Sequence, residues 1–147
     1  GTAGPLNLVR EQLTETFLVM NGDILTDIDF PDLIDFHAKE RSIATVALSK
    51  RDVEIDVGVV ELDTENRLLE WREKPVIDYL VSTGIYLFEP EALVDLPAAG
   101  FFNLPDLIVR LTDNEKKVKG YRHHGYWLDI GRAADYAKAC EDYGNLI

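Results

Sequence analysis

The apolar run Phe17-Leu18-Val19-Met20 stops at the turn pair Asn21-Gly22 and is followed at once by Asp23. Four apolar residues in a row predict a short buried strand, and Asn-Gly predicts the turn that ends it. In an open α/β sheet, ligands bind at the carboxyl ends of strands, so a carboxylate placed there can hold a metal ion. Asp is also common in turns, and this segment alone leaves the role of turn residue or helix cap equally open.

Similar apolar runs recur along the chain. They predict strands at 43–48, 57–62, 68–71, 81–88, 118–121 and 126–129, and the polar loop 63–67 predicts a hairpin. Apolar residues spaced three to four apart predict helices near 6–13, 31–39, 92–96 and 104–111, and after Gly131. Strands that alternate with helices predict an α/β fold with some antiparallel pairing, and 147 residues suit one domain.

Charge and composition exclude several classes of partner. The formal net charge of -12 and the pI of about 4.5 leave no basic footprint for nucleic acid, although a metal and a few cations can still bind phosphates. No apolar run approaches the length of a membrane span, so we expect no membrane partner. Cys140 is the sole cysteine, which permits no internal disulfide and fits a cytoplasmic location. In the last helix, the apolar stripe of Ala133, Tyr136, Ala137, Cys140 and Tyr143 is predicted to face the core.

Two acids and a lysine stand at predicted strand ends. Asp23 and Asp129 each follow an apolar strand, and Pro75 ends the strand that brings Lys74. Two carboxylates, completed by phosphate oxygens and water, suit Mg²⁺, and a lysine supplies a point charge for a phosphate. Gly58 and Gly84 would allow close approach of a sugar, with packing or a bulge as the alternative for Gly84. His37 is predicted to be a surface or hydrogen-bonded core residue, and His123-His124 are predicted to lie in a loop.

Five segments, taken in order, resemble motifs of the sugar nucleotidyltransferases, also called nucleotide-sugar pyrophosphorylases. They are Gly1-Thr2-Ala3-Gly4, Asn21-Gly22-Asp23, Glu73-Lys74-Pro75, Thr83–Pro90, and Gly125–Gly131 with Asp135-Tyr136. The resemblance implies a Rossmann-like α/β sheet, mixed and mostly parallel, with flanking helices. It also implies a reaction that joins a sugar 1-phosphate to a nucleoside triphosphate and releases a nucleotide sugar and pyrophosphate.

The same resemblance implies roles for individual residues. Asp23 and Asp129 would hold Mg²⁺, and Lys74 would bind the phosphate of the sugar, which makes these three the catalytic candidates. Eleven positions are the substrate-binding candidates: Gly1, Thr2, Ala3, Gly4, Asn21, Gly22, Gly58, Glu73, Thr83, Gly84 and Trp127.

The chain departs from the family pattern at its start. The family's glycine-rich Gly-x-Gly-Thr-Arg loop and its Pro-Lys-Pro segment, which neutralise the triphosphate, have no counterpart in this sequence. We therefore expect residues 1–147 to be the C-terminal part of a catalytic domain and to be nearly inactive alone. A sheet lacking its first strand is also expected to leave an open edge or apolar surface, which favours a homo-oligomer or another contact that covers the gap.

Two other functions stay open at this point. The chain could be a non-catalytic module that binds or senses a sugar phosphate. It could also be a metal-dependent glycosyltransferase in which Asp27-Ile28-Asp29 serves as an Asp-x-Asp metal motif, although that motif often occurs by chance.

Overall fold

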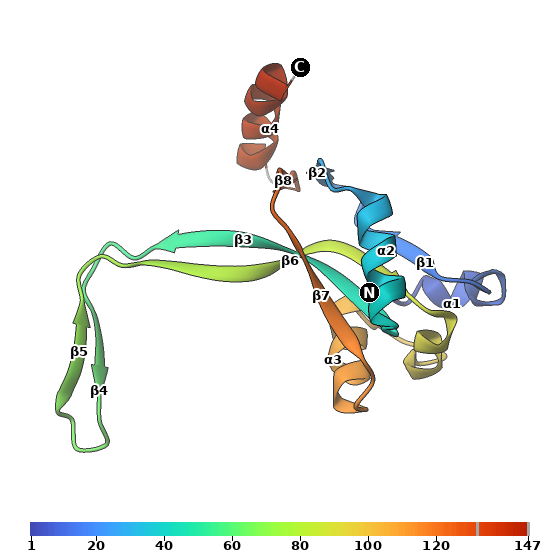
Figure 1. Cartoon of the computed structure of the whole chain (residues 1–147), viewed down its shortest axis with the longest axis horizontal. Helices are drawn as coiled ribbons and strands as arrows, with labels where there is room; N and C mark the ends of the chain where they lie inside the picture. The colour runs from blue at the N-terminus through green and yellow to red at the C-terminus, as the bar shows by residue number, and fades with distance from the viewer. Residues whose placement is uncertain (132, 147) are drawn as a thin grey trace.

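The computed structural model describes residues 1–131 and 133–146, and it is built around a four-stranded mixed sheet (Figure 1). The strands are β1 (Phe17–Met20), β6 (Val76–Phe88), β3 (Ala44–Glu54) and β7 (Val118–His123), in the order β1-β6-β3-β7. β6 is antiparallel to both of its neighbours, and β3 and β7 are parallel. The predicted mixed α/β sheet is therefore confirmed. Three of these four strands run in the same direction, but in the described residues β3–β7 is the one parallel pair.

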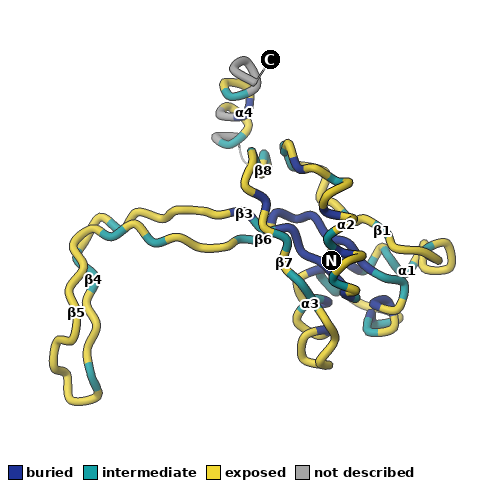
Figure 2. Tube along the Cα trace, in the orientation of Figure 1, coloured by how far each residue is buried: buried dark blue, intermediate teal, exposed yellow. Residues whose placement is uncertain are grey.

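Helices cover the two faces of this sheet and divide the core. Since side chains alternate along a strand, Ala44 and Val46 of β3 face one layer and Ala47 faces the other. The first layer packs against α3 (Leu104–Asp113) and η2 (Pro90–Asp95), and the second against α2 (Phe30–Glu40). The N-terminal helices α1 (Leu6–Val9) and η1 (Arg10–Gln12) flank the first layer. Figure 2 shows that the buried residues gather in this part of the chain.

Side chains cap the N-terminal ends of α2 and α3. The Asp29 side chain accepts a hydrogen bond of 3.0 Å from the backbone N–H of Asp32 and begins α2. Asn103 and Asp106 form a capping box at the start of α3. His37, on α2, is 1% exposed, and its ring nitrogens lie 2.7 Å from Oγ1 of Thr45 and 3.1 Å from a carboxylate oxygen of Glu89. It is thus a hydrogen-bonded core residue, one of the two predicted roles.

β3 and β6 continue beyond the sheet as a two-stranded ribbon, which is longer than the apolar runs predict. They pair as far as Glu54 and Val76, and the ribbon then leads into the predicted hairpin of β4 (Val59–Leu62) and β5 (Leu68–Arg72). Figure 1 shows this extension, which we call the arm (residues 52–78), projecting far from the sheet. Most of its large apolar side chains, including Leu69 and Trp71, are exposed.

A second small sheet lies beside the first. It pairs β2 (Ile24–Thr26) with β8 (Trp127–Asp129) in antiparallel fashion, and α4 (Ala133–Leu146) follows. The phenol of Tyr126 donates a 2.9 Å hydrogen bond to Asp142 of α4. Burial, together with the Asp142 carboxylate, raises the pKa of Tyr126 above its ordinary value.

The prediction for the inner face of α4 is wrong where it can be compared. Tyr136, Ala137 and Cys140 are exposed, whereas Ala139 is buried. The side chains of Ala133 and Tyr143 lie outside the described residues. An apolar stripe fixes which residues share a helix face, but it does not say that the rest of this chain covers that face.

In the described part of the chain, β1 pairs with β6 alone, and Leu18 and Met20 remain exposed along this strand. Self-association through such an edge stays a prediction. Over the same residues, no helix combines the length and the apolar character that crossing a membrane requires.

Candidate functional site

The two predicted metal ligands come together at the β2–β8 sheet. Ile24, next to Asp23, is paired with Asp129, and the backbone N–H of Ile130 donates a 2.9 Å hydrogen bond to the carbonyl of Asp23. A Cβ placed on Gly131 would lie 3.0 Å from Oδ1 of Asp129 and 3.1 Å from Oδ2 of Asp23. The two carboxylate oxygens are therefore within about 6 Å of each other. Glycine at 131 leaves the space between them open.

Gly84 sets the position of the segment that carries Asp23. Its φ is +75°, and β6 bulges there, because residues 83–85 stand opposite Ala47. The carbonyl of Gly84 accepts a 3.0 Å hydrogen bond from the N–H of Asn21. A Cβ on Gly84 would lie 2.7 Å from Nδ2 of Asn21 and 2.9 Å from Cδ1 of Ile24. The missing side chain thus makes room for the Asn21–Ile24 segment. A bulge also occurs at Gly84, which was one of the alternative roles predicted for this residue.

We expect Gly84→Ala to lower the free energy of unfolding by about 1–3 kcal/mol, because a left-handed φ disfavours a side chain and the methyl group meets Asn21 and Ile24. Urea denaturation of the variant gives this value directly. Gly22→Ala is the matched control, since a Cβ there would meet nothing within 4 Å. Equal stability of the two variants would contradict this account of Gly84.

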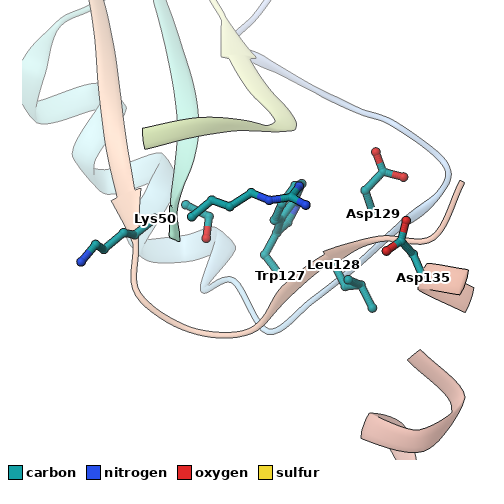
Figure 3. A pocket seen from close by; sticks show the side chains of 7 residues that line it. Lys50, Trp127, Leu128, Asp129 and Asp135 are labelled. Atoms are coloured by element: carbon teal, nitrogen blue, oxygen red, sulfur yellow. The ribbon is translucent and has the colours of Figure 1, made fainter. Parts of the chain in front are cut away.

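A cavity of about 320 Å³ adjoins Asp129 (Figure 3). Trp127 and Asp129 of β8, Asp135 of α4, and Ser49 and Arg51 of β3 contribute to its lining. The indole N–H of Trp127 donates a 2.9 Å hydrogen bond to the carbonyl of Thr83. Thr83 is itself buried, and its hydroxyl donates to the carbonyl of Ala47. Trp127 therefore lines the cavity, and Thr83 holds the indole of Trp127 in place through this hydrogen bond.

The donor atoms at this edge suit a hard cation. Asp23 and Asp129 are exposed and offer carboxylate oxygens, which Mg²⁺ binds together with water and phosphate oxygens. Among the residues that the structure describes, no group of three or more His, Cys, Asp or Glu side chains is arranged to hold a metal. The protein would accordingly supply two carboxylates and leave the other positions to substrate and solvent.

The N-terminal segment is docked against α3. The N–H groups of Ala3 and Gly4 donate to the carbonyl of Phe102, and the N–H of Leu104 donates to the hydroxyl of Thr2. Gly1 lies so close to Phe102 that a Cβ there would overlap its carbonyl. A second cavity, of about 280 Å³, joins this segment to the Asp23 turn, since its lining includes Thr2, Asn21, Tyr86, Asn103 and Asp106.

The structure does not bring the arm candidates to this site. Gly58 packs against the ring of Trp71, whose indole N–H donates to Glu73. Lys74 lies just before Val76, and Val76 is seven residues from Thr83, roughly 23 Å along a strand. Gly58, Glu73 and Lys74 are therefore gathered on the arm, away from Asp23 and Asp129 (Figure 1).

Both carboxylates of the alternative Asp-x-Asp motif, Asp27 and Asp29, contact other groups of the protein. Asp29 caps α2, and Oδ1 of Asp27 lies 3.0 Å from Nε2 of His123. His123 ends β7 instead of lying in a loop, and it is buried. The same ring nitrogen lies 3.1 Å from the carbonyl of Tyr126, so this contact fastens the turn before β8 to the segment after β2. The sequence signal for this contact was weak, because His123 follows the predicted strand 118–121 in a predicted loop and its partner, Asp27, lies nearly a hundred residues away.

These features define an α/β protein that has a mixed sheet and a two-carboxylate site at a small antiparallel sheet beside it. Its fold is that of the crystal structure of HddC from Yersinia pseudotuberculosis, with a TM-score of 0.67 and 23% identity, covering 97% of this chain and 62% of that one. The chain belongs to the nucleotidyl transferase family, whose model matches residues 1–145.

Named relatives agree with that family. The chain is 32% identical over 149 residues to a UTP–glucose-1-phosphate uridylyltransferase from Synechocystis sp., covering 95% of this chain and 38% of the relative. It is 32% identical over 142 residues to mannose-1-phosphate guanyltransferase beta-A from Xenopus laevis, covering 92% of this chain and 39% of the relative. The predicted family is thus confirmed, and the chain spans about two-fifths of the length of these relatives.

Proposed function

We propose that residues 1–147 form the metal- and sugar-phosphate-binding part of a catalytic domain that joins a sugar 1-phosphate to a nucleoside triphosphate. The products would be a nucleotide sugar and pyrophosphate. The observation that carries this proposal is the approach of the Asp23 and Asp129 oxygens to one point beside Gly131. The family and the sugar 1-phosphate enzymes among its relatives support the reaction class.

The chemistry needs positioning and charge neutralisation and no covalent nucleophile from the protein. An oxygen of the sugar phosphate attacks the α-phosphorus of the triphosphate, and the bond from that phosphorus to the leaving pyrophosphate breaks. Mg²⁺, when bound, neutralises charge on the phosphate oxygens. Asp23 and Asp129 would hold it. Trp127 would line the sugar-phosphate cavity from its anchored position on Thr83.

The names of the relatives guide the choice of ligand. Glucose 1-phosphate and mannose 1-phosphate are the sugar phosphates that we propose first, with uridine or guanosine triphosphate as the second substrate. The roles predicted for Lys74, Glu73 and Gly58 on the arm, and for the segment Gly1–Gly4, remain predictions, as does a cytoplasmic location.

Isothermal titration calorimetry of the chain with glucose 1-phosphate and mannose 1-phosphate tests the proposal. We expect binding of at least one of them in the presence of Mg²⁺ and a loss of at least ten-fold in affinity when EDTA removes the metal, because two bare carboxylates repel a phosphate. Free glucose and free mannose serve as controls for the phosphate. Absence of binding, or binding that is the same with EDTA, would count against the proposed function.

A further inference from the structure

The cavity beside Asp129 is lined in part by two cationic side chains, to which the resemblance to the family assigns no role. Lys50 and Arg51 of β3 contribute to its lining on one side, and Asp129 and Asp135 on the other. A phosphate cannot be held by carboxylates alone, so a cation in this cavity bears directly on which ligand it takes.

Lys50 is already engaged. Its amine lies 3.5 Å from Oδ1 of Asp52 and 3.9 Å from Oδ2 of Asp78, and both of these carboxylates belong to the arm. Figure 3 shows its side chain extending away from Asp129 and Asp135. Lys50 therefore helps to hold the β3–β6 ribbon together.

Arg51 is in a different position. Because side chains alternate along a strand, Arg51 shares a face of β3 with Ser49 and with Ala47, which packs in the α2 layer of the core. Ser49 and Arg51 line the cavity together with Trp127, which is fixed to β6 through Thr83. Among the residues that the structure describes, the Arg51 guanidinium has neither an ion-pair nor a hydrogen-bond partner. Arg51 is thus a charged group with no partner among the described residues, and it lines the same cavity as Asp129.

We propose that Arg51 is a phosphate-binding cation of this site, and that its guanidinium binds a phosphate group of the substrate in the 320 Å³ cavity next to Asp129. The inference rests on the proposed function and deepens it. A planar guanidinium matches a phosphate with two parallel hydrogen bonds, which a lysine cannot supply. The volume is at the lower end of the range for small-molecule sites, roughly 300–1,000 Å³, and suits a single phosphorylated sugar.

The test measures ligand affinity in Arg51→Gln and Arg51→Lys. Affinity is read from the change in tryptophan fluorescence on binding. All variants carry Trp71→Phe, so that Trp127, which lines the cavity, is the single tryptophan that reports on the ligand. Glucose 1-phosphate and UTP, each with Mg²⁺, are the two probes. We expect Arg51→Gln to weaken binding of at least one probe ten-fold or more, and Arg51→Lys to retain part of the affinity. A loss with glucose 1-phosphate assigns Arg51 to the sugar phosphate, and a loss with UTP alone assigns it to the triphosphate.

Arg67→Gln is the matched control, because Arg67 is an exposed arginine at the tip of the arm hairpin. We expect it to bind as the parent does. Wild-type affinity in Arg51→Gln would overturn the assignment of Arg51 while leaving the proposed function standing. So would a loss in Lys74→Gln that Arg51→Gln does not share. If the parent binds neither probe, the proposed function and this inference both fail.

Discussion

Asp129→Asn is expected to weaken the Mg²⁺-dependent binding of the sugar 1-phosphate by about 100-fold, or about 2.7 kcal/mol. The substitution removes one of the two carboxylate charges that approach each other beside Gly131. Asparagine keeps the shape and one carbonyl oxygen, which can still accept the 2.9 Å hydrogen bond from the N–H of Gly131. The loss would therefore reflect the missing charge at the metal and not a collapse of the turn after β8.

Asp23→Asn is expected to have an effect of similar size, because its carboxylate oxygen lies as close to the same point. Calorimetry with Mg²⁺ and the sugar 1-phosphate gives both affinities. Asp113→Asn, at the exposed C-terminal end of α3, removes the same charge elsewhere and is expected to bind normally. Normal binding in both site variants would mean that these carboxylates do not hold the metal.

The parts of the fold that local chemistry determines were predicted well. The hairpin tip is an example, because Asp63 accepts hydrogen bonds from the N–H groups of Glu65 and Arg67 within the loop itself. The starts of the predicted helices α2 and α3 are equally local, because a neighbouring side chain caps each of them. The lengths of β3 and β6 were underestimated, since the residues from Lys50 to Glu54 are polar or exposed and pair through their backbone. A ladder of that kind leaves little hydrophobic pattern in the sequence.

The candidate site also combines residues that the local sequence identifies with residues whose position depends on distant parts of the chain. Asp23 and Asp129 could be selected because each follows an apolar strand, and the prediction that they meet depended on the family motifs. Arg51 lies in a charged stretch that resembles any solvated strand, and it reaches the cavity through the register of β3 with its neighbours. Lys74 shows the opposite case. Its motif suggests a place at the site, but the position of a strand end in space depends on how far the ribbon extends, which the motif does not encode.

Phe88→Ala is expected to lower the free energy of unfolding by about 3–5 kcal/mol. Phe88 is 0% exposed, and its ring lies 5.8 Å from that of Phe17 and 5.9 Å from that of Tyr86, measured between ring centres. It is also paired with Phe17 of β1 and with Ala44 of β3, so its side chain packs where three strands of the sheet meet. Deleting the ring would leave a cavity between β1, β6 and β3, because closely packed neighbouring side chains relax only partly into such a space.

Phe101→Ala makes the same chemical change at a residue that is 80% exposed, and it is expected to alter stability by no more than about 0.5 kcal/mol. Urea denaturation followed by circular dichroism compares the two variants under identical conditions. Since β1 leads directly to Asn21 and Asp23, weaker packing at Phe88 should also loosen the segment that presents the first carboxylate. A difference below 1 kcal/mol between the two variants would mean that β1 is held mainly by its hydrogen bonds to β6, and that the aromatic cluster contributes little to the position of Asp23.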